Sequence, residues 1–213
     1  MDLLIASKNR HKVEEISAIL RVPGLRLLSM HDYPDLPDVE EDGATFEANA
    51  CKKALALARE TGLWALADDS GLEVEFLGGA PGVYSARYAG EPVSYPANNR
   101  KLLDALRGAR NRRARFRSVM ALASPAGACR TVEGRCAGHI APEERGRNGF
   151  GYDPLFIPAG YAQTFAEMGD ELKNRISHRA ASLREAWQAW GDFLSGRTNH
   201  LPPPDRSLSR AGS

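Results

Sequence analysis

The sequence has 213 residues, which is enough for one globular domain with a sizeable buried core. Hydrophobic residues make up 43 % and charged residues 26 % of the chain, which is the composition of an ordinary globular protein. The net charge of +1 creates no overall field that would attract nucleic acid or an acidic membrane, so we expect neither as a partner.

The cysteines and the N-terminus indicate the compartment. Cys51, Cys129 and Cys136 show neither CxxC nor Cys/His metal spacing, which favours a reducing environment. The apolar run at residues 3–6 is far too short for a signal peptide or a membrane span. We therefore expect a cytoplasmic protein.

The first predicted elements are a buried strand at residues 3–6, a polar loop and a helix. Four apolar residues recur at helical spacing: Val13, Ile16, Ile19 and Leu20. Backbone N–H groups at a helix start favour anions, so Ser7, Asn9 and Lys12 are candidate phosphate ligands. The segment lacks the glycines of a Walker loop, and a capped helix with a solvated basic first turn is the alternative.

A second, weaker strand is predicted at residues 25–30, and two prolines predict a loop over residues 33–39. Three consecutive acids follow: Glu40, Glu41 and Asp42. They are either a solvated surface run or the source of one carboxylate for a metal. Thr45 opens an amphipathic helix on which Asn49 is a candidate for fixed hydrogen bonds to acids or ligands, while most charged residues, such as Lys53, are expected to face solvent.

The sequence is organised around an apolar run at residues 63–67, which predicts a short buried strand. Two acids and a Ser-Gly pair follow directly: Asp68, Asp69, Ser70 and Gly71. A strand end that delivers paired carboxylates into a glycine-rich turn suits a hard cation. A polar turn without a ligand is the alternative. The Gly- and Pro-rich residues 78–88 predict an ordered loop.

Residues 92–98 predict a polar connection, and the leucines of residues 102–106 mark another amphipathic helix. The basic run at residues 107–117 is either a nucleic-acid patch or a loop leading into a strand with an arginine-rich edge. We favour the strand, because aromatic residues are not interleaved with the arginines. Residues 116–124 and 130–140 predict an antiparallel pair, so the sheet is expected to be mixed.

The glycines of residues 148–156 allow a ligand to approach the backbone closely. We expect Phe150 or Tyr152 to form an apolar wall for a base, and Asp153 to bond a base edge or ribose. The alternative is a tight turn whose aromatic residues belong to the core.

Two helices are predicted near the C-terminus. The capping box at residues 164–167 is expected to open a helix that carries Lys173. Ser177 is expected to cap the last helix, which places His178 and Arg179 in its first turn, where basic residues favour a nearby anion. The predicted apolar face of this helix is Leu183, Ala186, Trp187, Trp190 and Leu194.

Six motifs together resemble those of one enzyme family. The motifs are Ser7-x-Asn9-x-x-Lys12, residues 46–50, residues 67–72, residues 78–88, residues 150–154 and Ser177-His178-Arg179. They resemble, in the same order, the motifs of the non-standard purine nucleoside triphosphate pyrophosphatases, the Ham1-like inosine and xanthosine triphosphatases. The resemblance extends from about Leu3 to Leu194.

The resemblance implies an α/β fold with an elongated mixed β-sheet flanked by helices, in two lobes with a central active-site cleft. We expect one two-lobed domain over residues 1–196 and a disordered, Pro-, Ser- and Arg-rich tail over residues 197–213. The resemblance also implies Mg²⁺-dependent hydrolysis of dITP, ITP and XTP to the monophosphate and pyrophosphate, which would cleanse the nucleotide pool. It further implies a homodimer.

The resemblance implies roles for individual residues. Asp69 would be the general base, and the candidate metal ligands are Glu40, Asp68 and Asp69, with Glu41 in place of Glu40 left open. The implied substrate-binding residues are Ser7, Lys8, Asn9, Arg10, His11, Lys12, Ser70, Phe150, Gly151, Tyr152, Asp153, Lys173, His178 and Arg179.

Within that set, the resemblance distinguishes two groups. Ser7, Asn9 and Lys12 would hold the triphosphate. The base would be read or clamped by Lys173, His178 and Arg179. Replacing Arg179 by Ala is expected to impair turnover much more than the fold. Lys8 and His11 stand where many members of the family have small residues.

Two other functions remain open. One is a related pyrophosphatase for a pyrimidine or modified nucleotide, which a substrate profile would distinguish. The other is a nucleic-acid-binding module that uses residues 107–117, which salt-dependent binding surviving the loss of Asp69 would distinguish. The second function leaves the acidic and glycine motifs unused.

Overall fold

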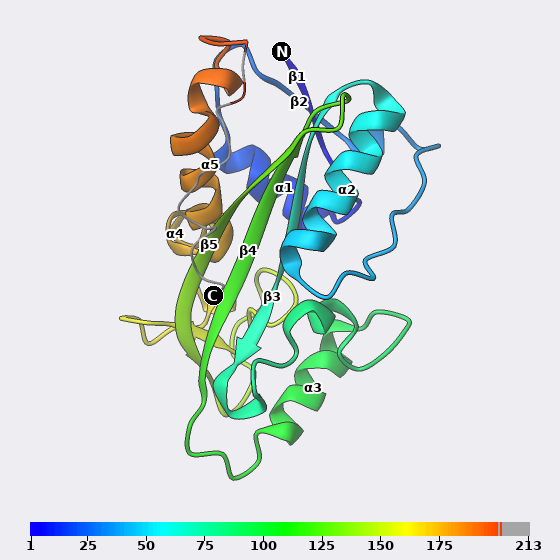
Figure 1. Cartoon of the computed structure of the whole chain (residues 1–213). Helices are drawn as coiled ribbons and strands as arrows, with labels where there is room; N and C mark the ends of the chain where they lie inside the picture. The colour runs from blue at the N-terminus through cyan, green and yellow to red at the C-terminus, as the bar shows by residue number, and fades with distance from the viewer. Residues whose placement is uncertain (200, 202–213) are drawn as a thin grey trace, which may run out of the picture.

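The computed structural model describes residues 1–199 and residue 201, with helices packed on both faces of one six-stranded sheet (Figure 1). The strands are β1 (Asp2–Ile5), β2 (Arg26–Ser29), β3 (Trp64–Val74), β4 (Arg113–Ala123), β5 (Cys129–Ile140) and β6 (Phe156–Pro158), in the order β2-β1-β3-β4-β5-β6. β1 runs parallel to β2 and β3, and the other pairs are antiparallel, which confirms the predicted mixed sheet. Most of the tail expected from residue 197 lies outside the described residues.

The helices are α1 (Arg10–Ile19), α2 (Phe46–Thr61), α3 (Tyr95–Ala105), α4 (Asp170–Ile176) and α5 (His178–Leu194). Thr45 and Ser177 cap α2 and α5 through side-chain hydrogen bonds, as the sequence predicts. α5 packs so closely on β5 that a Cβ atom at Gly134 would lie 2.0 Å from the backbone nitrogen of Ser182. None of the described helices is long and apolar enough to cross a membrane.

The buried apolar side chains form separate clusters that define two lobes. In the upper part of Figure 1, α2 covers one face of the sheet with a cluster that includes Phe46 and Leu57. α1 and α5 cover the opposite face with a cluster that includes Ile16 and Leu183. A further cluster around Phe156 joins α3 to the far ends of β3, β4 and β5 in the lower part. The long central strands therefore connect both lobes.

The largest difference from the sequence prediction concerns β3, which does not end before the acids. It continues through Asp68 and Asp69 to Val74, because β4 pairs with it along ten consecutive positions. β1, in contrast, pairs with β3 only as far as Leu66. Beyond Leu66 one edge of β3 is therefore uncovered by a strand, and both acids lie at this open edge rather than in a turn.

Three smaller predictions are also wrong. Helix α3 begins at Tyr95, inside the predicted connection, because Ser94 caps it and a proline occupies its first turn. The capping box at residues 164–167 is formed, but it closes a single 3-10 turn, and α4 with Lys173 begins separately at Asp170. Trp187, predicted on the apolar face of α5, is 42 % exposed.

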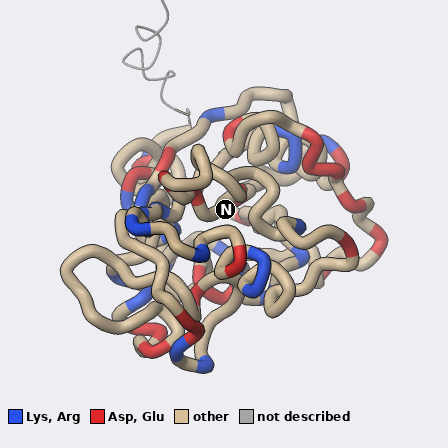
Figure 2. The backbone as a smooth tube through the Cα atoms, turned by 90° about the horizontal axis from the view of Figure 1, so that it is seen from below, with Lys and Arg blue, Asp and Glu red and all other residues tan. Residues whose placement is uncertain are grey.

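The arginine-rich segment does not form an edge strand, because β4 lies between β3 and β5. Two arginines of β4 form ion pairs across the sheet. Arg115 pairs with Glu73, and Arg117 pairs with Glu73 and Glu133 from the two neighbouring strands. Figure 2 shows basic and acidic residues interspersed along the chain.

Candidate active site

The N-terminus of α1 lies at the open edge of β3. Asn9 caps the helix, since its Oδ1 accepts from the backbone N–H of Lys12 (3.3 Å). The backbone N–H of Asn9 donates to Oγ of Ser7 (3.2 Å). The side-chain Nδ2 of Asn9 donates to Oη of Tyr95 on α3 (3.4 Å). The first turn contains no acidic residue, so the helix dipole leaves this end of α1 positive. The bond from Asn9 to Tyr95 also connects this helix end to α3 in the other lobe.

Asp68 is almost completely buried and accepts hydrogen bonds from four side chains. Its Oδ2 lies 2.9 Å from Nζ of Lys12 and 3.0 Å from Nη2 of Arg179. Ser70 donates to the same oxygen (3.0 Å), and Ser118 donates to Oδ1 (2.6 Å). Burial alone would raise the pKa of Asp68, but Arg179 and Lys12 outweigh it and hold the pKa well below its usual value. In this structure Asp68 therefore anchors Lys12 and Arg179, and its predicted role as a metal ligand stays a prediction.

Glu15 on α1 connects the basic residues of the C-terminal helices. Its carboxylate accepts from Nζ of Lys173 (2.8 Å) and from Nη1 of Arg179. Burial opposes ionisation, yet Arg179 and Lys173 lower the pKa of Glu15 to about 2. Sequence reasoning missed this residue. Its position three residues after Lys12, on the same face of α1, is the signal that could have identified it.

Asp69 points to the opposite face of β3, because successive side chains alternate across a strand. Its Oδ1 lies 3.6 Å from Nζ of Lys53, and its buried Oδ2 has no hydrogen-bond partner in the described part of the chain. Burial raises the pKa of Asp69, although Lys53 and Lys12 oppose this shift. Lys53 also binds Oε1 of Glu41 (2.7 Å), so it is buried between two acids rather than exposed as predicted.

The acidic loop, residues 40–43, is held over Asp69 by hydrogen bonds that other side chains make to the loop backbone. Asn49, which is fully buried, accepts from the N–H of Gly43 (2.7 Å), so its role is structural. Arg87 donates to the carbonyl oxygen of Glu41 (2.8 Å). The Glu41 side chain is partly buried against Lys53, whereas Glu40 is exposed. Glu41, and not Glu40, is therefore the acid of this loop that faces Asp69.

Phe150 and Tyr152, the two aromatic residues of the glycine-containing loop at residues 148–154, lie in different environments. Phe150 is partly exposed and stacks on His11 with ring centroids 5.1 Å apart. Tyr152 is buried in the lower cluster and donates to the carbonyl of Ser85 (2.9 Å). Asp153 accepts from the backbone N–H of Phe150 (2.9 Å), which fixes the loop from inside. Phe150 is thus the accessible aromatic wall.

His178 lies beneath this loop, with its ring stacked on Phe116 at 4.6 Å between centroids. Burial and the neighbouring Arg179 lower the pKa of His178 well below its usual value, so the imidazole is neutral at neutral pH. Among the residues that the structure describes, its Nδ1 and the Nε of Arg179 have no hydrogen-bond partner, although both atoms are buried. Both residues line a cavity, so these atoms are candidates for bonds to a ligand.

Two cavities meet at this site. The walls of the first include Phe116, Phe150, Lys173, His178 and Arg179. The walls of the second include Ser7, Lys8, Glu41 and Lys53. Asn9, Lys12 and Ala86 line both cavities. An elongated ligand with an aromatic end and an anionic end would fit across this junction.

The structure brings most of the predicted substrate-binding residues to these cavities. Ser70, Gly151, Tyr152 and Asp153 line the first cavity. Lys8 is also paired with Asp38 (2.8 Å) at the surface. Arg10 is exposed and lines neither cavity, and His11 reaches the site through its contact with Phe150.

The residues around Lys53 fit a magnesium ion, although the described part of the chain has no cluster of three or more His, Cys, Asp or Glu that could hold a metal. Asp69 provides a buried oxygen without a partner, and Glu41 provides a second carboxylate on the other side of Lys53. Mg²⁺ commonly binds through one or two carboxylates together with substrate phosphates and water. Two carboxylates from the protein would therefore be enough to hold Mg²⁺ once substrate phosphates and water supply the other ligands.

The fold and the site define an α/β enzyme that acts on a phosphorylated small molecule with an aromatic base. The sequence profile of the Ham1 family matches residues 3–189, and the chain therefore belongs to the Ham1 family.

Known relatives agree with this assignment. A protein of Desulforamulus reducens named dITP/XTP pyrophosphatase is 53 % identical over 190 residues, covering 88 % of this chain and 94 % of the relative. The solved Ham1 protein of Staphylococcus aureus matches with a TM-score of 0.81 and 40 % identity, covering 93 % of this chain and 100 % of the Staphylococcus aureus chain. A HAM1 protein of Coxiella burnetii matches with a TM-score of 0.82 and 39 % identity, covering 90 % and 99 % of the two chains.

Proposed function

We propose that the protein hydrolyses dITP, ITP and XTP to the nucleoside monophosphate and pyrophosphate. The observation that carries this proposal is the junction of the two cavities at Asn9 and Lys12, with Phe150 on one side and Asp69 beyond the other. The relatives named dITP/XTP pyrophosphatase support the same reaction. Its cellular effect would be to remove non-standard purines from the nucleotide pool.

In the proposed complex, the base stacks on Phe150 and the triphosphate crosses the open edge of β3 into the second cavity. Lys12 and the N–H groups at the start of α1 attract the phosphates. Asp68 holds the Lys12 ammonium in place by an ion pair of 2.9 Å. The positive charge is therefore positioned before the substrate arrives, which lowers the cost of binding.

Asp69 is the proposed general base. Its unpartnered Oδ2 accepts a proton from water while the water oxygen attacks the α-phosphorus. The bond from the α-phosphorus to the bridging oxygen breaks, and pyrophosphate leaves with the electron pair. No covalent nucleophile is required.

Magnesium is the proposed cofactor, with Glu41 and Asp69 as the ligands supplied by the protein. When bound, it would offset the negative charge of the triphosphate and of the leaving pyrophosphate. Lys53, which lies between these carboxylates, offsets part of their mutual repulsion in the free enzyme.

Discrimination against adenine follows from the donors left unpaired in the first cavity. Arg179 has only N–H donors, and its Nε lacks a partner. A keto oxygen at C6 of the purine can accept from such a group, whereas the amino group of adenine presents another donor. Glu15 and Asp153 hold Lys173, and Glu15 and Asp68 hold Arg179, so these donors are already oriented.

The test is pyrophosphate release with Mg²⁺ from ITP, dITP and XTP compared with ATP, GTP and UTP. We expect selective turnover of the first three, with pyrophosphate rather than orthophosphate as the product. Asp69→Asn should reduce turnover by about 10²–10⁴-fold, which is the usual contribution of a general base. Preferred turnover of a pyrimidine substrate, or release of orthophosphate, would disprove the proposed substrate or bond.

We also propose a cytoplasmic homodimer. The three cysteines are free thiols, which is typical of a reducing compartment. Large apolar side chains are exposed between residues 76 and 93, namely Phe76, Tyr84 and Val93. Such side chains favour a protein interface. Light scattering on the purified protein would give the mass of the assembly, and a monomeric mass would exclude the dimer.

A further inference from the structure

Cys51 and Cys129 are in direct contact although they are 78 residues apart in the sequence. Cys51 lies in α2, and Cys129 is the first residue of β5. Their Sγ atoms are 2.8 Å apart and share a hydrogen bond. A disulfide bond has a length of about 2.05 Å, so the two sulfur atoms need to move by less than about 1 Å to form one.

The surroundings of the pair permit oxidation, whereas those of the third cysteine do not. Cys51 and Cys129 are both partly exposed, while Cys136 is buried. The hydrogen bond from Cys129 lowers the pKa of Cys51, which favours the reactive thiolate. Burial raises the pKa of Cys136 to about 11. The pair thus combines an accessible thiolate with an adjacent thiol.

We propose that Cys51 and Cys129 are a modification site, at which hydrogen peroxide oxidises the two thiols to a reversible disulfide. The Cys51 thiolate attacks the peroxide, an S–O bond forms and the O–O bond breaks, giving a sulfenic acid and, after protonation, one water. The Cys129 sulfur then attacks the Cys51 sulfur, the S–S bond forms and the S–O bond breaks, releasing a second water. Two thiols are oxidised, and one peroxide is reduced to two waters.

The bond would join α2 to the start of β5. Both cysteines pack against the cluster that fixes α2 on the sheet. α2 also carries Asn49 and Lys53, which hold the acidic loop and Asp69. Because the thiols already touch, only a small movement of the sulfur atoms is needed to form the bond. It removes conformational freedom from the unfolded chain across a long loop, so it stabilises the fold.

The full-length chain is the material for the test. Wild type, Cys51→Ser, Cys129→Ser and Cys136→Ser are treated with hydrogen peroxide, alkylated and mapped by peptide mass spectrometry. We expect a Cys51–Cys129 peptide in wild type and in Cys136→Ser, and none in the other two variants. Dithiothreitol should restore both free thiols.

Thermal unfolding of the same samples measures the consequence. Oxidation should raise the Tm of wild type and of Cys136→Ser by about 5 °C or more, and it should leave the Tm of the other two variants unchanged. Each comparison is made within one variant, so a weaker fold does not affect it, and neither readout depends on nucleotide hydrolysis. The proposal is overturned if three thiols stay alkylatable, if the bond forms only between chains, or if Tm does not rise.

Discussion

Arg179 and Asp68 form a buried ion pair between residues that lie 111 positions apart, with Nη2 of the arginine 3.0 Å from Oδ2 of the aspartate. The Arg179 side chain is 1 % exposed and that of Asp68 is 0 % exposed. The same arginine binds Glu15, so it joins α5 to α1 and β3 and is also a wall of the first cavity. Its loss would therefore affect more than base recognition.

The first prediction concerns stability. Arg179→Ala should lower the free energy of unfolding by about 3–5 kcal/mol, because it leaves Asp68 buried without its main counter-charge. This differs from the sequence-based expectation that the substitution would mainly impair turnover. Urea unfolding provides the measurement.

Arg107→Ala is the matched control, since Arg107 is 80 % exposed and its pair with Asp104 should contribute less than about 1 kcal/mol. Equal unfolding midpoints for the two variants would show that Arg179 does not support the fold.

The second prediction concerns magnesium. Glu41→Gln should raise the Mg²⁺ concentration needed for half-maximal activity by at least about tenfold, since even indirect partners of metal ligands commonly contribute 10–100-fold. Glu40→Gln is the matched control, because the neighbouring Glu40 is exposed. Activity measured against Mg²⁺ concentration separates the two. A larger shift for Glu40→Gln would reverse the assignment.

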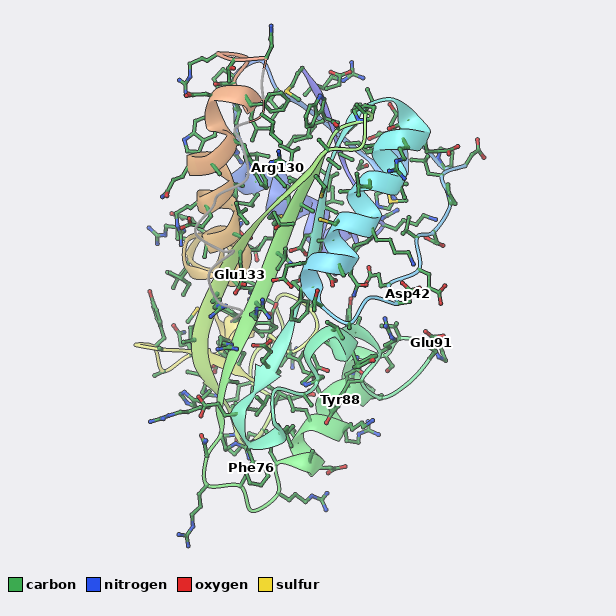
Figure 3. All side chains as sticks on the ribbon, in the orientation of Figure 1. Asp42, Phe76, Tyr88, Glu91, Arg130 and Glu133 are labelled. Carbon is green, nitrogen blue, oxygen red and sulfur yellow. The ribbon has the colours of Figure 1, made fainter. Side chains whose placement is uncertain are left out.

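The third prediction concerns the aromatic wall. Phe150→Ala should raise KM for ITP by about tenfold or more with a small change in kcat, because stacking contributes about 1–3 kcal/mol per base. Tyr161→Ala is the control, since Tyr161 is 40 % exposed and lines neither cavity, whereas Phe76 at the lower end of the molecule (Figure 3) belongs to the proposed dimer surface. Steady-state kinetics would exclude a stacking role if both variants behaved alike.

The fourth prediction concerns pH. Glu15 has its pKa lowered from 4.5 to about 2 in the folded protein, so its stabilising contribution is complete above pH 4.5 and is lost as the pH falls towards 2. A shift of this size corresponds to about 3 kcal/mol. The difference in unfolding free energy between wild type and Glu15→Gln should therefore be largest near neutral pH and shrink in acid.

Glu14→Gln is the control for Glu15, because the adjacent Glu14 side chain is 73 % exposed. Its stability should follow that of wild type across the whole pH range. A constant difference between wild type and Glu15→Gln from pH 7 to 2 would contradict the proposed linkage.

Local signals in the sequence predict much of this structure. The Thr45 and Ser177 caps, the mixed sheet and the hairpin of β4 and β5 are confirmed, because they depend on side-chain periodicity and on neighbours in the chain. The extension of β3 through Asp68 was not predicted. Asp, Ser and Gly are turn residues by local preference, and here pairing with β4 overrides that preference.

The missed site residues have a common cause. Glu15 and Lys53 are charged residues on helices, which normally face solvent, and only tertiary packing shows that they are buried among opposite charges. The choice between Glu40 and Glu41 likewise depends on which side of the loop faces Lys53. No local pattern decides it.

The alternation of β3 has one further consequence for how this enzyme could change. Asp68 and Asp69 are consecutive, yet one supports Arg179 and the other faces Lys53 on the far side of the sheet. The sheet thus acts as a partition, with the residues proposed to recognise the base on the α5 face and the residues proposed for hydrolysis on the α2 face. A library of variants confined to the α5 side could alter which bases are accepted while the hydrolytic groups behind the partition stay intact.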